Sequence, residues 1–162
     1  MKNKIKINSL VNLIFSCIIF IFEIMPESIK WVWNSGPDGG IQIIYTSYIM
    51  EAGLMLWGIG FLTLIIALFT ITNIIINAVS LLDDRNRFKI TTLTTTSICL
   101  IGSVILVALM REHVTLQNIF IMAFFFIQII LHVVNLILSS KQKKLEKTKD
   151  KKINTEVQIE NE

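Results

Sequence analysis

The fold of this chain is decided by residues 53–79, which read GLMLWGIGFLTLIIALFTITNIIINAV. This stretch has 27 residues and no charged side chain, whereas a helix needs only about 20 mainly apolar residues to cross the roughly 30 Å hydrocarbon core of a bilayer. Small or weakly polar residues recur in it at seven-residue spacing, which places them on one stripe of a helix: Gly53, Gly60, Ala67, Thr63, Thr70 and Asn77. Helices in lipid associate through close backbone approach and interhelical hydrogen bonds. We therefore predict a membrane-spanning helix that packs against other helices of the same chain.

The composition extends this prediction to the whole chain. Of the 162 residues, 53% are hydrophobic and 17% are charged, against about 25% charged in soluble domains. Four apolar runs predict spanning helices at about 7–25, 50–79, 90–110 and 116–138. The expected fold is all-α, a transmembrane up-down-up-down four-helix bundle over residues 1–140. Residues 141–162, basic and then acidic, are expected to form a flexible tail or a frayed helical extension.

The first apolar run has a signal peptide as its alternative, because Lys2, Lys4 and Lys6 precede it. The residues that follow it, 23–27, read EIMPE and contain no small-residue cleavage site, so we expect a retained span. Cys17 and Cys99 fall within predicted spans and have no disulfide or zinc spacing, so they are expected to be packing residues.

Residues 26–50 are expected to form a loop against the membrane surface. The run NSGPDGG at 34–40 predicts a turn, and Trp31, Trp33, Tyr45 and Tyr48 are aromatic residues of the kind that settle at the headgroup level. Ile41–Ile44 could lie in the interface or form a short strand.

The distribution of basic residues predicts the orientation. Of the 15 Lys and Arg residues, 13 lie in the N-terminal segment, the 81–89 loop and the tail; Lys30 and Arg111 are the exceptions. Cytoplasmic segments collect Lys and Arg, so we expect a multi-pass protein of the cell membrane with both termini cytoplasmic. The tail lysines could also bind anionic lipid headgroups. Other membrane proteins or a second copy of the chain are further candidate partners, and no nucleic acid is expected.

Every predicted span carries polar residues in its cytoplasmic half, and these are expected to converge inside the bundle because unpaired polar groups are costly in lipid. The candidate cluster comprises Asn12, Asn73, Asn77, Gln128, His132 and Asn135. The favoured interpretation is interhelical contacts of about 0.6 kcal/mol each. The alternative makes His132 a proton-responsive or ligand-binding group.

Other polar residues are expected at the opposite side of the membrane. Glu23 and Glu51 lie near the outer ends of the first two spans, where we expect them to be solvated and structural; the alternative is that they mark an ion or proton path, as intramembrane carboxylates often do. Trp31, Trp33 and Asp38 are expected to anchor the loop, with recognition of an external ligand as the alternative. No motif for a catalytic, cofactor-binding or metal-binding residue is present, so an enzyme is not expected.

Two motifs carry a resemblance. Glu23-Ile24-Met25-Pro26 closes the first span, and Tyr45-Thr46-Ser47-Tyr48 follows a loop rich in Trp, Gly and Pro and precedes the long second span. In this plan, over most of its length, the chain resembles small four-span membrane proteins of unknown function that are common in low-GC Gram-positive bacteria; the resemblance implies no activity. We predict a non-enzymatic accessory or interaction component, with a small transporter or channel subunit as the alternative.

Overall fold

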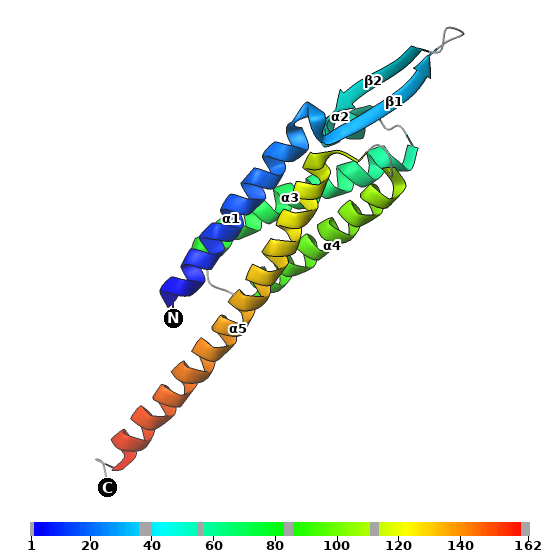
Figure 1. Cartoon of the computed structure of the whole chain (residues 1–162). Coiled ribbons are helices and arrows are strands. Elements are labelled where there is room, and N and C mark those ends of the chain that lie inside the picture. The colour runs from blue at the N-terminus through cyan, green and yellow to red at the C-terminus, as the bar shows by residue number, and fades with distance from the viewer. Residues whose placement is uncertain (1, 36–39, 55–56, 83–85, 111–113, 160–162) are drawn as a thin grey trace.

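The computed structural model describes residues 2–35, 40–54, 57–82, 86–110 and 114–159. Among these, the side chains at 2, 31–35, 40–42, 52–54, 57–58, 86 and 149–159 are not described. Four long helices lie side by side, and a two-stranded hairpin projects from one end of them (Figure 1). In chain order the elements are α1 (Lys2–Ile24), the 3-10 turn η1 (Pro26–Ser28), β1 (Ile29–Ser35), β2 (Gly40–Thr46), α2 (Tyr48–Leu54), α3 (Trp57–Leu82), α4 (Asn86–Met110) and α5 (Leu116–Ile159).

Four helices in the described part of the chain are long and apolar enough to cross a membrane, which confirms the prediction of four helices of this kind. The stretches that meet this criterion are Asn3–Ile24, Ile59–Leu82, Arg87–Met110 and Leu116–Thr148. One helix was predicted over about 50–79, but the structure has two separate elements there, α2 and α3. Gly53, Gly58 and Gly60 lower the helix propensity around the junction.

α5 is much longer than the predicted fourth span. It continues as one helix of 44 residues to Ile159, over most of the segment for which a flexible tail was predicted. Lys, Gln and Glu dominate this extension and all have high helix propensity. A side-chain pair one turn apart adds to it, because Gln142 donates to Glu146 over 3.0 Å.

The outer loop contains an antiparallel hairpin, in which Ile29 pairs with Thr46 and Ser35 with Gly40. Ile41–Ile44 therefore lie in a strand, which decides between the two alternatives. The base of the hairpin is attached to α5: Thr115 donates its hydroxyl to the carbonyl of Ser28 over 3.1 Å, and the Ser28 hydroxyl lies 3.1 Å from Oε1 of Gln117. Asp38 lies outside the described residues, and the side chains of Trp31 and Trp33 are not described.

Each long helix has two principal long neighbours: α1 and α4 both pack against α3 and α5. The N-terminus and the extension of α5 lie at the end of the bundle opposite the hairpin (Figure 1). α2 packs against α3 and α1 beneath the hairpin. The helices thus enclose one interior along their common length.

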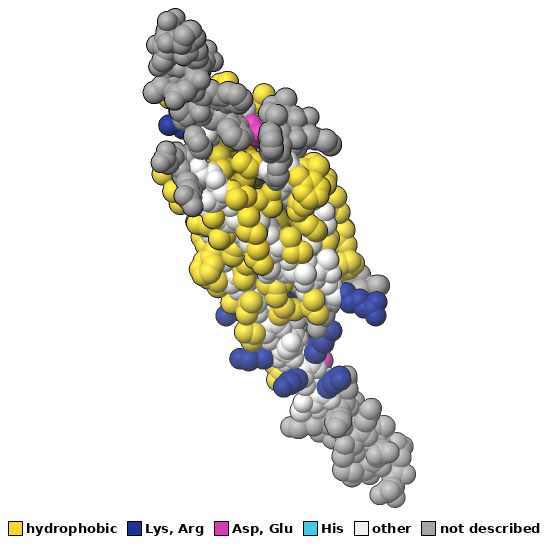
Figure 2. Space-filling view, turned by 90° about the vertical axis from the view of Figure 1, so that its right-hand side faces the viewer, with side chains coloured by type: hydrophobic (Ala, Val, Ile, Leu, Met, Phe, Trp, Pro, Cys, Tyr) yellow, Lys and Arg dark blue, Asp and Glu magenta, His cyan; other side chains and the backbone are white. Residues whose placement is uncertain are grey.

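The distribution of polar and apolar residues is the reverse of that in a soluble protein, with polar side chains buried and apolar side chains exposed. On α1, Ile7, Ile14 and Ile21 are each more than half exposed, whereas Asn12 and Ser16 are 0% and 1% exposed. Figure 2 shows the result on one face of the molecule as a broad apolar belt across its middle, with Lys and Arg gathered mainly at its lower end. An exposed apolar surface this extensive is typical of contact with lipid.

Close approach of α3 and α4 depends on a glycine. A Cβ placed on Gly102 would lie 3.1 Å from Cγ1 of Ile66, so a larger residue would require the Ile66 side chain or its helix to shift. Nearby, Cys99 is buried and its thiol donates to the carbonyl of Ile66 over 3.8 Å.

Cys17 is exposed on the outer surface of α1. Its predicted packing role is therefore wrong, because its position on the helix faces away from the bundle.

Candidate functional site

All six residues of the predicted polar cluster are buried. The exposed fraction does not exceed 2% for any of them: Asn12, Asn73, Asn77, Gln128, His132 and Asn135. They come from α1, α3 and α5, and α4 adds threonines at the same interior. Four of the six are connected by hydrogen bonds through Ser16 and Asn12, and the other two bond to different hydroxyls.

Ser16 on α1 is the centre of the network. Its hydroxyl accepts hydrogen bonds from Nε2 of Gln128 over 2.7 Å and from Nδ2 of Asn77 over 3.3 Å. It donates its own proton to the backbone carbonyl of Asn12 over 3.0 Å. One donor and two acceptor positions complete the capacity of a hydroxyl. Through this single oxygen, α1, α3 and α5 are held together.

Gln128 and His132 are one helical turn apart on α5 and both contact Asn12. The second proton of the Gln128 amide goes to the Asn12 carbonyl over 2.9 Å. Nδ2 of Asn12 lies 3.3 Å from Nδ1 of His132, and the Thr92 hydroxyl on α4 lies 3.4 Å from the same nitrogen. An amide nitrogen can only donate, so Nδ1 is the acceptor and the ring carries its proton on Nε2.

The two remaining residues of the predicted cluster are paired elsewhere. Asn73 on α3 accepts from the Thr95 hydroxyl on α4. Nδ2 of Asn135 lies 3.4 Å from the Ser9 hydroxyl on α1. These contacts join helices as the network does, but no hydrogen bond in the described part of the chain links them to Ser16.

Several polar atoms of this interior make no hydrogen bond among the described residues: Oδ1 of Asn12, Nδ2 of Asn73, Oε1 of Gln128, Nε2 of His132 and Oδ1 of Asn135. Each belongs to a side chain whose other polar atom is bonded across helices. The interior therefore combines direct pairing with unused hydrogen-bonding capacity.

The carboxyl groups near the hairpin end contradict the sequence-based expectation. Glu23 and Glu51 were expected to be solvated, but their exposed fractions are 0% and 1%. Oε1 of Glu23 accepts from the Thr70 hydroxyl on α3 over 2.8 Å. Oε1 of Glu51 accepts from the Thr46 hydroxyl over 2.6 Å. The expectation failed because α2 and the hairpin cover this end of the bundle.

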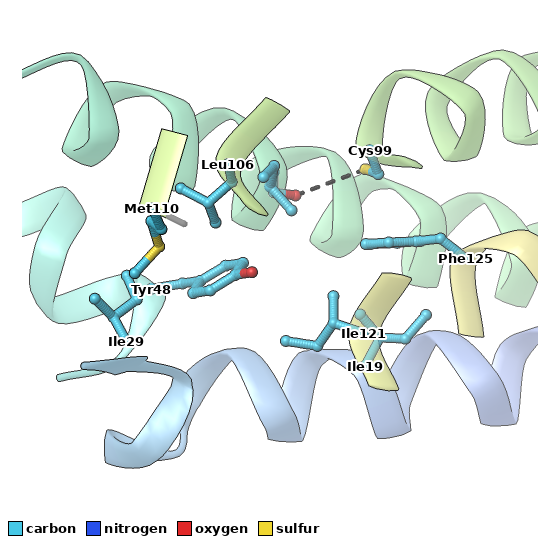
Figure 3. Close-up of a cluster of buried hydrophobic side chains, with 9 residues drawn as sticks. Ile19, Ile29, Tyr48, Cys99, Leu106, Met110, Ile121 and Phe125 are labelled. Atoms are coloured by element: carbon cyan, nitrogen blue, oxygen red, sulfur yellow. Dashed lines mark hydrogen bonds between the residues drawn. The ribbon is translucent and has the colours of Figure 1, made fainter. Parts of the chain in front are cut away.

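Tyr48 is a fully buried member of the apolar core. In Figure 3 its ring lies beside Leu106 and Met110, and its hydroxyl points into the bundle. The hydroxyl donates to Oδ1 of Asn118 on α5 over 2.8 Å. Burial, together with the nearby Glu23 carboxyl, raises the pKa of the Tyr48 phenol well above its ordinary value. A buried neutral phenol here links α2 to α5.

The predicted cluster did not include the hydroxyls that complete these contacts, namely Ser9, Ser16, Thr92 and Thr95. A signal was present for Ser16, because Asn12, Ser16, Ile19 and Glu23 follow one helical face. Glu23 lies on the same helical face, which would have predicted its burial. It was instead expected to be solvated because it lies near the end of the span.

The chemistry available is hydrogen bonding and proton exchange. Among the described residues, no group of three His, Cys, Asp or Glu side chains is placed to hold a metal ion. Comparisons with protein families, with curated proteins and with solved structures find no match to this chain.

Proposed function

We propose that this chain is a multi-pass protein of the cell membrane, an up-down-up-down four-helix bundle with both termini in the cytoplasm. In this proposal it is not an enzyme. It acts as an accessory or interaction component, presenting the hairpin outside and the α5 extension inside. The proposal includes membership of the four-span membrane proteins that the sequence resembles.

The placement in a membrane is supported by the four apolar helices and by the apolar belt (Figure 2). The orientation is supported by the charges, because 13 of the 15 Lys and Arg residues lie in the N-terminal segment, the 81–89 loop and the tail. Both termini lie at one end of the bundle, opposite the hairpin (Figure 1). The excess of basic residues at that end favours the cytoplasmic side.

The single observation that carries the accessory role is the Ser16 network. Its donors and acceptors are protein groups on three different helices, bonded at 2.7–3.3 Å. Direct pairing of this kind fixes helices against one another and uses the polar groups that a water-filled path would need. A bundle fixed in this way acts through what it presents at its two ends.

The surfaces at those ends are different in chemistry. The described start of the α5 extension exposes Lys141, Lys143, Lys144 and Lys147. These side chains would meet anionic lipid headgroups at the cytoplasmic surface, each contributing about 1 kcal/mol, or the acidic surface of another membrane protein or copy. On the hairpin, Ile43, Ile44 and Tyr45 are about half exposed.

A small transporter or channel subunit is the second candidate, and one observation favours it. Asn12, Gln128, His132 and Asn135 each keep a polar atom with no hydrogen bond among the described residues. Water in a path between the helices could bond these atoms. In that case the unused groups would line the path.

Cysteine accessibility in intact cells separates the two candidates. Cys17 and Cys99 are replaced by Ala, and single cysteines are introduced at Asn73, Gln128, His132 and Asn135. Labelling at Gln128 and His132 by small thiol reagents would support the transporter, and no labelling at any of the four positions would support the packed accessory bundle.

Two further cysteines test the orientation: one at Ile44 should react with a membrane-impermeant reagent, and one at Lys144 only with a permeant reagent. The reverse pattern would overturn the proposed topology.

A further inference from the structure

Glu23 is a carboxyl group enclosed by the protein at the hairpin end of α1. Its exposed fraction is 0%, and it lies in the last turn of a helix that is apolar enough to span a membrane. Thr70 on α3 contacts it directly. Tyr48 on α2 and Cys99 on α4 are close enough to interact with it electrostatically. Groups from three other helices thus surround one carboxyl.

The hydrogen bonds of this carboxyl are unequal. Oε1 accepts from the Thr70 hydroxyl over 2.8 Å, whereas Oε2 has no hydrogen-bond partner among the described residues. The Thr70 hydroxyl has one proton, and the carbonyl of Ile66 lies 3.0 Å away as a competing acceptor. Within the described ranges of the chain, the Thr70 hydroxyl is therefore the one hydrogen-bond donor to a negative charge on Glu23, and the Ile66 carbonyl competes for its proton.

No Lys, Arg or His side chain in the part of the chain that the structure describes is paired with Glu23. α2 contributes Tyr48 and, further along, the Glu51 carboxyl, which is bonded to Thr46. α3 contributes Thr70, and α4 contributes the Cys99 thiol. On α5 the core residues Ile121 and Phe125 are apolar, and Asn118 is bonded to Tyr48. In η1, Glu27 is exposed.

An ionised carboxylate without a cation is far more costly to bury than the neutral acid, so such a group takes up a proton. We propose that Glu23 is a reversible proton-binding site of the bundle, with the proton carried on Oε2 and Oε1 accepting from Thr70. Binding converts the carboxylate and one proton from water into the neutral acid. Release puts a negative charge next to the Tyr48 phenol, where α2 meets the bundle, and so favours rehydration of this junction.

This proposal uses the membrane placement argued above but neither the accessory nor the transporter role. Whether or not the introduced cysteines react with the thiol reagents, the proposal for Glu23 is unaffected. Conversely, the absence of a bound proton at Glu23 would leave the topology and the packed interior as they are.

The test uses N,N′-dicyclohexylcarbodiimide, an apolar reagent that adds to protonated carboxyl groups in apolar surroundings. The full chain in lipid nanodiscs is treated at a series of pH values from 6 to 9, and peptide mass spectrometry locates the adducts. We expect an adduct at Glu23 at neutral pH that decreases as the pH rises. It should be absent in Glu23→Gln and retained in the matched control Glu51→Gln.

Thr70→Val gives a second reading, because it removes the hydrogen bond that favours the charged form; the Glu23 adduct should then persist to higher pH. A Glu23 that stays unmodified across the series, or that reacts with a water-soluble carbodiimide in preference to the apolar one, would overturn the proposal. Peptide mapping of the wild-type protein carries this test even if Glu23→Gln fails to fold.

Discussion

Nδ2 of Asn12 lies 3.3 Å from Nδ1 of His132, although the two residues are 120 positions apart in the chain. Their contact joins the first long helix to the last. The Thr92 hydroxyl reaches the same nitrogen from α4, so three helices meet at one neutral imidazole. This arrangement makes the contribution of the pair measurable, because either partner can be removed on its own.

We expect Asn12→Leu and His132→Leu each to destabilise the bundle by about 1–3 kcal/mol, since each leaves a buried polar partner unsatisfied. The double variant should lose less than the sum, by roughly 0.6 kcal/mol and up to about 1.7 kcal/mol. Reversible unfolding in bicelles measures all four corners of the cycle. Thr72→Val is the matched control, because the Thr72 hydroxyl bonds only within its own helix; strict additivity would show that the pair makes no specific contact.

The close approach of α3 and α4 gives a second prediction. Gly102→Val adds methyl groups where a Cβ alone would lie 3.1 Å from Ile66. Overpacking of this kind costs about 1–3 kcal/mol, and the same unfolding assay measures it. Ile101→Val on the outer face, where the side chain is 60% exposed, should change the stability little. Equal effects of the two variants would mean that Gly102 does not limit the helix separation.

The interior of this bundle could be predicted in part from helical spacing alone. Gln128, His132 and Asn135 recur at steps of four and three, and all three are buried as a single α5 face. Their partners could not be predicted, because spacing within a helix carries no information on how neighbouring helices are shifted along one another. Ser16 shows this best, since its role depends on meeting both α3 and α5.

The hairpin end was harder to predict for a different reason. Hydropathy gives the depth of Glu23 in the membrane but does not show what covers it. Burial of that carboxyl depends on α2, a seven-residue helix that the continuous apolar pattern of residues 50–79 concealed. For residues 141–162 the sequence left a flexible tail and a frayed helical extension both open, because a charged composition is shared by exposed helices and flexible tails alike.

The start of α2 gives a third prediction. The Ser47 hydroxyl accepts the backbone N–H of Met50 over 3.1 Å, which is an N-terminal cap. Ser47→Ala should destabilise α2 by about 1 kcal/mol, which hydrogen exchange would detect as roughly five-fold faster exchange of its first amides. Ser47→Thr keeps the acceptor and should protect them; equal exchange in both variants would exclude a capping role.

The pH dependence of stability gives a last prediction, which concerns Tyr48. Its phenol is fully buried and donates to Asn118, and burial raises its pKa above the value of about 10 found in unfolded chains. The folded state therefore holds this proton more tightly than the unfolded state. The contribution to stability is fully present below pH 10 or so and is lost as the pH rises above it.

Tyr48→Phe removes the ionising group together with its hydrogen bond. Below about pH 9 the variant should be less stable than the wild type by about 1–3 kcal/mol, because Oδ1 of Asn118 loses its donor. Above about pH 10 the wild type should lose stability more steeply, so the two curves converge. Tyr45→Phe, at a side chain that is 50% exposed, is the matched control below about pH 9, where it should change the stability little. Parallel curves for the wild type and Tyr48→Phe up to about pH 12 would show that the phenol ionises as easily in the folded protein as in the unfolded chain, and the burial argument would then be wrong.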